Sequence, residues 1–171
     1  MLALIETLFD IIRLRKGPDA IPHSTVLFVV IVALWLFAGL IMTLLTAELD
    51  EKDFVLGTIT GVAGLLCYTA IVVLSGKRAR LMQTVMALLG CGALLSLMFV
   101  AGNVFFTPFL SENISNLIVT LILLWTVPVE GHIISRAVDR HWYVGVVAAM
   151  AVFVFQLILY SAMDPATVTP T

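Results

Sequence analysis

The stretch WTVPVEGHIISRAVDRHW, residues 125–142, decides how this chain is interpreted, because it leads from a long apolar run into a charged segment. The apolar run is long enough to belong to a membrane-crossing helix, which takes about 20 residues. Pro128, Glu130 and His132 fall within five residues, and arginines follow at positions 136 and 140. The stretch is therefore either a polar site inside a membrane or the point where a helix leaves the lipid.

The composition places the chain among helical membrane proteins. Hydrophobic residues make up 61% of the 171 residues, charged residues make up 12%, and the mean hydropathy is +1.14. A soluble domain is typically about 45–50% apolar and about 25% charged, so a water-soluble fold of this size cannot hide the excess apolar surface. Cys67 and Cys91 fall inside apolar runs without a Cys-x-x-Cys motif, and we interpret them as buried, inert thiols.

Five apolar runs separated by short polar segments predict an all-α fold, a polytopic bundle of five transmembrane helices. The predicted spans are about 24–46, 54–75, 81–102, 114–135 and 142–163. Together they form one transmembrane domain at 24–163, followed by a short tail at 164–171. In the fourth span, Pro128 removes a backbone donor and crowds the preceding turn, so we expect a helix bend near Leu124.

Residues 1–16 predict an amphipathic helix rather than a span. Four large apolar side chains recur there at helical spacing and form one stripe: Ile5, Leu8, Phe9 and Ile12. We expect this helix to lie in the membrane interface, with Arg13, Arg15 and Lys16 beside anionic headgroups. Packing against the chain's own spans is the alternative. A Gly/Pro linker at 17–23 then ends the helix, because proline cannot continue it.

Positive charge falls on one side of the predicted topology. Nine residues are Lys or Arg, and all except Lys52 lie at connections on that side: Arg13, Arg15, Lys16, Lys77, Arg78, Arg80, Arg136 and Arg140. The positive-inside rule then predicts a cytoplasmic N-terminus and a C-terminus outside the cell. A four-span topology would leave basic connections on both sides, so this distribution favours five spans.

Two of the predicted spans carry small residues that let helix backbones approach each other. Gly57, Gly61 and Gly64 lie in the second span, and Gly90 and Gly92 lie in the third. Because a short loop joins these two spans, we expect them to form a tight hairpin. The alternative is a dimer interface, which would make the protein a homo-oligomer.

The charged end of the fourth span supports two interpretations. Intramembrane ionisable groups are functional candidates, so Glu130 and His132 are one candidate site for handling protons or ions. However, Glu130 lies only about 9 Å along the helix axis from Arg136, at 1.5 Å per residue, so it is near the inner edge. The central parts of the other spans carry no Asp, Glu, Lys or Arg. These observations favour an interfacial helix end with snorkelling charges, in which His132 and Arg136 share a face.

The sequence carries no recognisable catalytic motif, whether G-x-S-x-G, H-E-x-x-H, P-loop or dinucleotide fingerprint. His23, His132 and His141 lack ligand spacing within one helix face, so we expect neither a metal nor a cofactor. Nucleic acid is not an expected partner, because there is no basic domain. The expected partners are the lipid bilayer and other membrane proteins.

Taken together, these features resemble the Yip1-like membrane proteins, particularly the small bacterial members. The resemblance spans most of the chain: a short N-terminal segment, the approach KGPDAIPHS at 16–24, five spans and an outside C-terminus. The closest local likeness is GHIISRAVDRHWYVGVVAAMAVFV at 131–154, where a short basic turn precedes the last helix. The resemblance implies the fold and a bacterial inner membrane location, not an activity.

We therefore expect a non-enzymatic integral membrane protein, a scaffold or accessory protein that acts through protein or lipid contacts. Its expected contact surface is the inner face, formed by the Ile5–Ile12 helix, the Lys77–Arg80 turn and the Arg136–Trp142 turn. The alternative is a small transporter or channel component that uses Glu130 and His132. A wet interior path would favour transport, and its expected residues are Thr58, Thr60, Ser96 and Gln156. A dry seam of small residues would favour the contact role.

Overall fold

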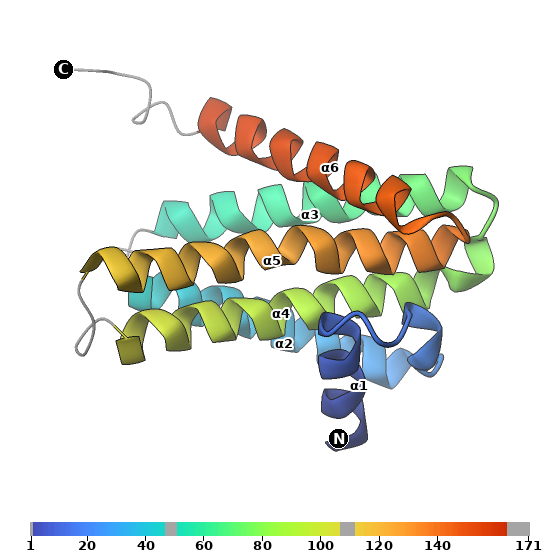
Figure 1. Ribbon diagram of the computed structural model, residues 1–171, viewed down its shortest axis with the longest axis horizontal. Helices are drawn as coiled ribbons and strands as arrows, with labels where there is room; N and C mark the ends of the chain where they lie inside the picture. Colours follow the sequence, from blue (N-terminus) through green and yellow to red (C-terminus); the bar gives the residue numbers. More distant parts are fainter. Residues whose placement is uncertain (1, 47–50, 107–111, 164–171) are drawn as a thin grey trace.

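The computed structural model describes residues 2–46, 51–106 and 112–163, and every regular element in these ranges is helical. The elements are α1 (Leu2–Ile12), η1 (Pro18–Ala20), α2 (Thr25–Thr46), α3 (Glu51–Leu74), η2 (Arg78–Arg80), α4 (Leu81–Phe106), α5 (Glu112–Val138) and α6 (Trp142–Met163). Helices α2 to α6 are long and apolar enough to cross a membrane, which confirms the predicted all-α class with five such helices. They lie side by side in an elongated bundle, and α1 crosses it (Figure 1).

The helix ends follow local backbone chemistry. After α3, Gly76 has a φ of 75°, and the N–H groups of Gly76 and Lys77 donate to carbonyls of the last turn, a cap that glycine permits. After α5, Asp139 has a φ of 54°, and the N–H of Arg140 donates to Ser135 at 2.9 Å. Pro128 lies inside α5, which continues through it as one helix. The predicted tail at 164–171 and most of the acidic connection before Lys52 lie outside the described residues.

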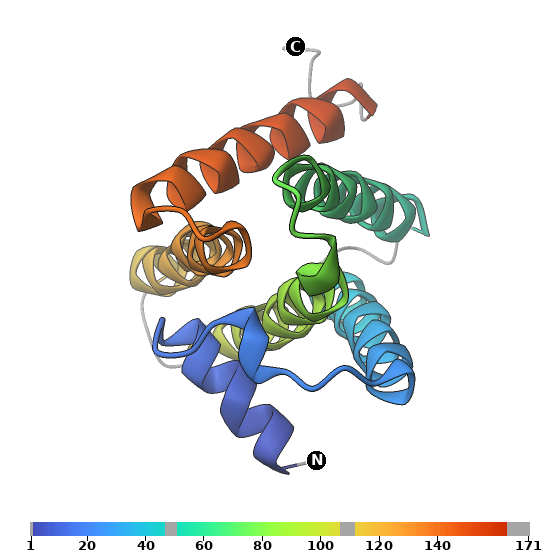
Figure 2. The ribbon, with the colours of Figure 1, turned by 90° about the vertical axis from the view of Figure 1, so that its right-hand side faces the viewer.

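The core of the bundle is formed by α4 and α5. In their apolar segments 56% and 50% of the residues are buried, against 11% in α2 and 17% in α6. Helix α4 packs between α2 and α5, and α6 covers α3 and α5 (Figure 2). The outer helices expose large apolar side chains such as Phe37 on α2 and Ile158 on α6. Lipid can cover such surfaces, whereas water cannot do so at low free energy.

The glycines of α3 and α4 pack against other helices than the sequence predicted. A Cβ on Gly61 would meet Trp35 of α2, and one on Gly64 would meet the amide of Gln156 on α6. Leu8 of α1 lies over Gly90, whereas Gly57 and Gly92 have no atom within 4 Å of a Cβ. The small residues therefore bring α3 close to α2 and α6, and α4 close to α1. None of these glycines packs α3 tightly on α4, because a short loop does not decide which faces of two helices meet.

A very close helix approach involving glycine lies between α5 and α6, at Gly131 and Gly145, which were not predicted as packing residues. A Cβ on Gly145 would overlap the carbonyl oxygen of Gly131 and the backbone of Ser135. A Cβ on Gly131 would lie 2.7 Å from the Cα of Val146. Both positions require glycine because the obstacle is backbone, which cannot rotate away.

Candidate functional site

The eight Lys and Arg residues predicted to share one side gather at one end of the bundle, which we call the basic end. It contains the segment from α1 to α2, the turn between α3 and α4, and the turn between α5 and α6 (Figure 1). Its basic residues are Arg13, Arg15, Lys16, Lys77, Arg78, Arg80, Arg136 and Arg140. The basic end thus joins three connections that are far apart in the sequence.

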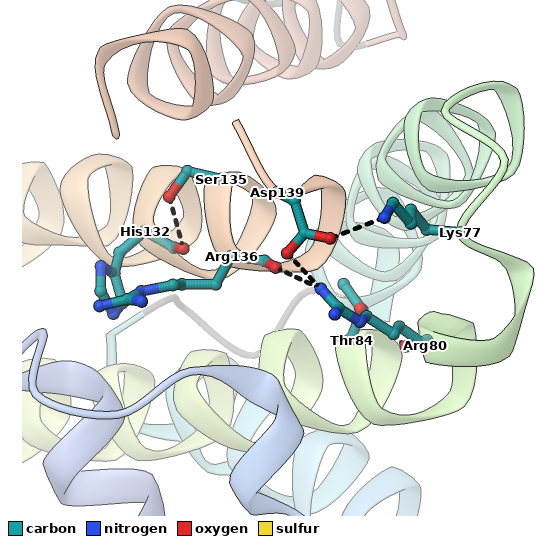
Figure 3. Close-up of polar contacts among 7 residues, drawn as sticks. All are labelled: Lys77, Arg80, Thr84, His132, Ser135, Arg136 and Asp139. Atoms are coloured by element: carbon teal, nitrogen blue, oxygen red, sulfur yellow. Dashed lines mark hydrogen bonds and ion pairs between the residues drawn. The ribbon is translucent and has the colours of Figure 1, made fainter. Parts of the chain in front are cut away.

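Asp139 ties two of these connections together. Its carboxylate lies 2.7 Å from the Lys77 ammonium and 2.6 Å from the Arg80 guanidinium (Figure 3). The same Arg80 nitrogen donates to the carbonyl oxygen of Arg136 at 3.0 Å and so caps α5. A carboxylate at a helix C-terminus normally opposes the helix dipole. Here the bonds from Lys77 and Arg80 outweigh that effect and hold the pKa of Asp139 down to about 2.

The N-terminal segment is held to the bundle through its backbone carbonyls. His132 Nε2 lies 3.0 Å from the carbonyl oxygen of Lys16, and because a carbonyl only accepts, Nε2 carries the proton. Gln83 on α4 donates to Ile21 at 2.7 Å, and the Trp125 indole on α5 donates to Ile12 at 3.2 Å. Buried polar side chains normally find such partners. His132, predicted as a site residue, therefore has a definite docking contact in the structure.

Helix α1 divides its apolar stripe between the bundle and the exterior. Leu8, Ile11 and Ile12 are buried against α4 and α5, which corresponds to the packing alternative, whereas Ile5 and Phe9 stay exposed. At its polar end, Lys16 lies 2.8 Å from Asp10 and holds the pKa of that carboxyl below its usual range. The amphipathic pattern thus serves packing on one side and leaves apolar surface on the other.

The structure separates Glu130 from His132. Glu130 Oε2 accepts a hydrogen bond of 2.6 Å from the hydroxyl of Tyr68 on α3, whereas His132 turns to the N-terminal segment. Helix residues two positions apart do not face each other. Tyr68 was not predicted as a partner, although it lies four residues after Gly64, on the same face of α3. That spacing is the signal that could have placed its ring in the interior.

His132 and Arg136 do share a face of α5, as the sequence predicted. The Arg136 side chain runs back along α5 toward the His132 ring (Figure 3). The stem of Arg136 lies beside Gly17, so a Cβ on that glycine would approach the Arg136 Cβ to 3.3 Å. Arg136 therefore lies between α5 and the docked N-terminal segment.

The interior polar groups are bonded within the protein. Gln156 on α6 donates to the carbonyl oxygen of Thr60 at 3.1 Å, and the Thr60 hydroxyl donates to Leu56 at 2.9 Å in its own helix. No buried side-chain nitrogen or oxygen in the described ranges lacks a partner. Thr58 and Ser96 line a pocket of about 350 Å³, which shares no lining residue with a pocket of about 390 Å³ at the basic end. These two pockets therefore do not form a continuous polar path.

Five arginines of the basic end remain available for contacts. They are exposed, and none of their side chains makes an ion pair or hydrogen bond within the described part of the chain: Arg13, Arg15, Arg78, Arg136 and Arg140. By contrast, Lys16, Lys77 and Arg80 are engaged with carboxylates. The basic residues are therefore of two kinds, those that form an ion pair with a carboxylate and those that are unpaired.

The described residues contain no group of three or more His, Cys, Asp and Glu side chains that could hold a metal ion. Comparison with known proteins found no matching family model, no matching curated protein and no matching solved structure.

Proposed function

We propose that this chain is a non-enzymatic integral membrane protein, a scaffold or accessory protein that acts through contacts made at its basic end. The proposal rests on one observation: ion pairs fix the surface of the basic end, and the same surface also presents unpaired arginines. Lys77, Arg80 and Asp139 fix the two turns relative to each other. A surface ordered in advance loses less conformational entropy when a partner binds, which favours recognition over non-specific attraction.

The proposed location follows from the same charges. Lysine and arginine at one end of five spans favour a cytoplasmic basic end, with the N-terminus inside and the C-terminus outside. The resemblance to the small bacterial Yip1-like proteins, which is itself part of the proposal, favours the bacterial inner membrane. The interior polar groups are bonded within the protein, as Gln156 is to Thr60, which supports a contact role rather than a transport path.

Helix α1 is proposed to lie along the inner leaflet. Its exposed Ile5 and Phe9 would face lipid, while Leu8 packs on Gly90. Gly90 lies about 13 Å along α4 from Leu81, at 1.5 Å per residue. Helix α1 also crosses the spans instead of running along them (Figure 1). This placement suits an amphipathic helix in the region of the headgroup–acyl boundary.

Gentle extraction from native membranes, followed by co-purification and mass spectrometry, tests the proposal. The informative variant combines Arg15→Gln with Arg78→Gln, because both side chains are exposed and neither braces Asp139. Glu6→Gln, at an exposed acid on α1, is the control. We expect a stoichiometric partner with the wild type and the control but not with the double variant. A protein recovered alone, only with itself, or with the same partner in all three forms would contradict the proposal.

A second candidate function is a small transporter or channel component, and the contact between Glu130 and Tyr68 is the observation that favours it. An ionisable carboxylate held between two spans is a candidate for a proton or ion pathway. His132 Nε2 lies 3.0 Å from the carbonyl oxygen of Lys16, so His132 is not part of the same site as Glu130. This function predicts a flux in proteoliposomes that disappears in Glu130→Gln at equal expression. Undiminished flux in that variant would exclude Glu130 from the transport path.

A further inference from the structure

A pocket at the basic end has the features of an anion site. It occupies about 390 Å³ where α5 ends and α6 begins, a volume within the range of small-ligand pockets. Arg140, His141 and Trp142 line it from the turn and the start of α6, and His132, Ser135 and Arg136 line it from α5. Asp139 is also among its lining residues.

The charge balance of this pocket is positive. Arg136 and Arg140 are unpaired, whereas the carboxylate of Asp139 is occupied by Lys77 and Arg80. Asp19 lies next to Gly17, close to the stem of Arg136, but the two charged groups form no ion pair. The pocket therefore presents two guanidinium groups whose charges are not neutralised locally.

Helix α6 adds a further feature suited to anions. It begins at Trp142, at the wall of the pocket, and runs for 22 residues. The N-terminus of a helix carries a partial positive charge and attracts phosphate groups. Guanidinium groups add paired hydrogen bonds of matching geometry, which makes arginine the preferred side chain for binding phosphate. Two arginines and a helix start thus converge on one pocket.

The surface next to the pocket indicates a lipid. Trp142 and Tyr143 are exposed at the start of α6, where aromatic residues are typical of a membrane interface. An exposed apolar stripe then continues along α6 through Val147, Met150 and Val154. The acyl chain of a phospholipid can lie on that stripe while the phosphate of the same lipid occupies the pocket.

We infer that the pocket formed by Arg136, Arg140 and the start of α6 binds the phosphate group of an anionic phospholipid. This inference rests on the proposed placement of the basic end at the membrane surface, and it names a lipid as one partner of that end. It assigns Arg136 and Arg140 to lipid and leaves Arg15 and Arg78 to the protein partner, so it replaces the expectation from the sequence that placed Arg15 beside anionic headgroups.

Native mass spectrometry of the purified full chain, titrated with phosphatidylglycerol, tests the assignment. Phosphatidylcholine and inorganic phosphate serve as the comparison probes. The variant Arg136→Gln/Arg140→Gln removes both guanidinium groups, and Arg15→Gln/Arg78→Gln is its control with the same change in net charge. We expect the first variant to bind phosphatidylglycerol about tenfold more weakly or worse, because it loses charge-assisted hydrogen bonds. The control should stay within about twofold of the wild type.

Other results would overturn the inference. Equal losses in both double variants would indicate general electrostatic attraction, and equal binding of phosphatidylcholine would indicate no headgroup selection. Inorganic phosphate that binds as tightly as the lipid would overturn the lipid assignment. If Arg136→Gln/Arg140→Gln loses its helical circular dichroism, the lipid titration is repeated with Arg140→Gln alone. That variant should stay folded, because Arg140 takes part in the cap of α5 through its backbone N–H and not through its side chain. Loss of the protein partner in Arg15→Gln/Arg78→Gln with unchanged lipid binding would separate the two proposals.

Discussion

The basic end and the middle of the bundle are held together by different interactions. At the basic end, charged and amide side chains reach carboxylates and backbone carbonyls of other segments, as Arg80 does with Asp139 and Gln83 with Ile21. In the middle, glycines admit side chains of neighbouring helices, as Gly61 does with Trp35 and Gly64 with Gln156. The spans are therefore positioned mainly by steric fit, while the connecting segments are positioned by polar contacts. The two regions should respond differently to substitution, salt and pH.

The largest effect is expected where helices meet by steric fit, from Gly145→Ala close to the start of α6. The added methyl group would overlap the backbone of Gly131 and Ser135, so α5 and α6 must move apart. Overpacking of this kind costs about 1–3 kcal/mol, and sometimes more. Thermal unfolding in detergent should show the loss as a lower midpoint.

The matched control for that prediction is Gly92→Ala, since a Cβ there meets no atom within 4 Å. Its expected effect is within about 0.5 kcal/mol of the wild type. If Gly92→Ala destabilised the protein as much as Gly145→Ala, steric fit between α5 and α6 would not explain the loss of stability in Gly145→Ala.

A smaller effect is expected from Gln156→Met, which keeps the length of the side chain but removes its donor to Thr60. Hydrogen bonds between membrane helices contribute about 0.6 kcal/mol on average, and at most about 1.7. The unfolding midpoint should fall slightly, while Met150→Leu, on the exposed side of α6, should leave it unchanged. A gain in stability would mean that the amide is an unfavourable occupant of the interior.

Asp139→Asn should weaken the basic end in a way that depends on pH and salt. The folded-state pKa of Asp139 is lowered from an ordinary value of 3.8 to about 2. The stabilisation from Lys77 and Arg80 is therefore fully present above pH 3.8 and is lost as the pH falls through about 2. The difference in unfolding midpoint between wild type and variant should be small at pH 7 and shrink toward pH 2.

High salt should reduce the same difference, because Asp139 is exposed and its ion pairs are screened. Asparagine also tolerates the left-handed backbone of this position, so a change of conformation is not expected to contribute. A difference between wild type and Asp139→Asn that grew on acidification would contradict the ion-pair explanation.

The smallest effect on stability is expected from Arg78→Gln. Its side chain is exposed and makes no ion pair or hydrogen bond with the described residues, so its unfolding midpoint should match that of the wild type. A clear loss of stability would show that Arg78 braces the turn, as Lys77 and Arg80 do.

Some of this architecture could be predicted from the sequence because it depends on local patterns. Apolar runs predicted five helices long enough to span a membrane. Charges at the connections predicted that basic residues would share one end. Each of these features is determined within a segment of about 20 residues.

The sequence could not identify which segments meet. His132 and Gln83 bond to backbone carbonyls, and a carbonyl leaves no mark in the sequence of the segment that supplies it. The partner of Gly64 depends on which face of α6 lies opposite, so the predicted hairpin between α3 and α4 rested on the loop alone. Asp139 carried a weak signal, as an acid directly after a helix and between arginines.

We propose that the basic end lies in the cytoplasm and that the opposite end of the spans lies outside. Labelling of single introduced cysteines with a membrane-impermeant maleimide tests it most directly. Arg78→Cys marks the basic end, Ser161→Cys marks the exposed far part of α6, and the wild type, whose Cys67 and Cys91 lie within helices, is the blank. We predict that Ser161→Cys reacts in intact cells, and that Arg78→Cys reacts only once the reagent reaches the cytoplasm. Reaction of Arg78→Cys from outside, or of both positions from one side, would contradict this orientation.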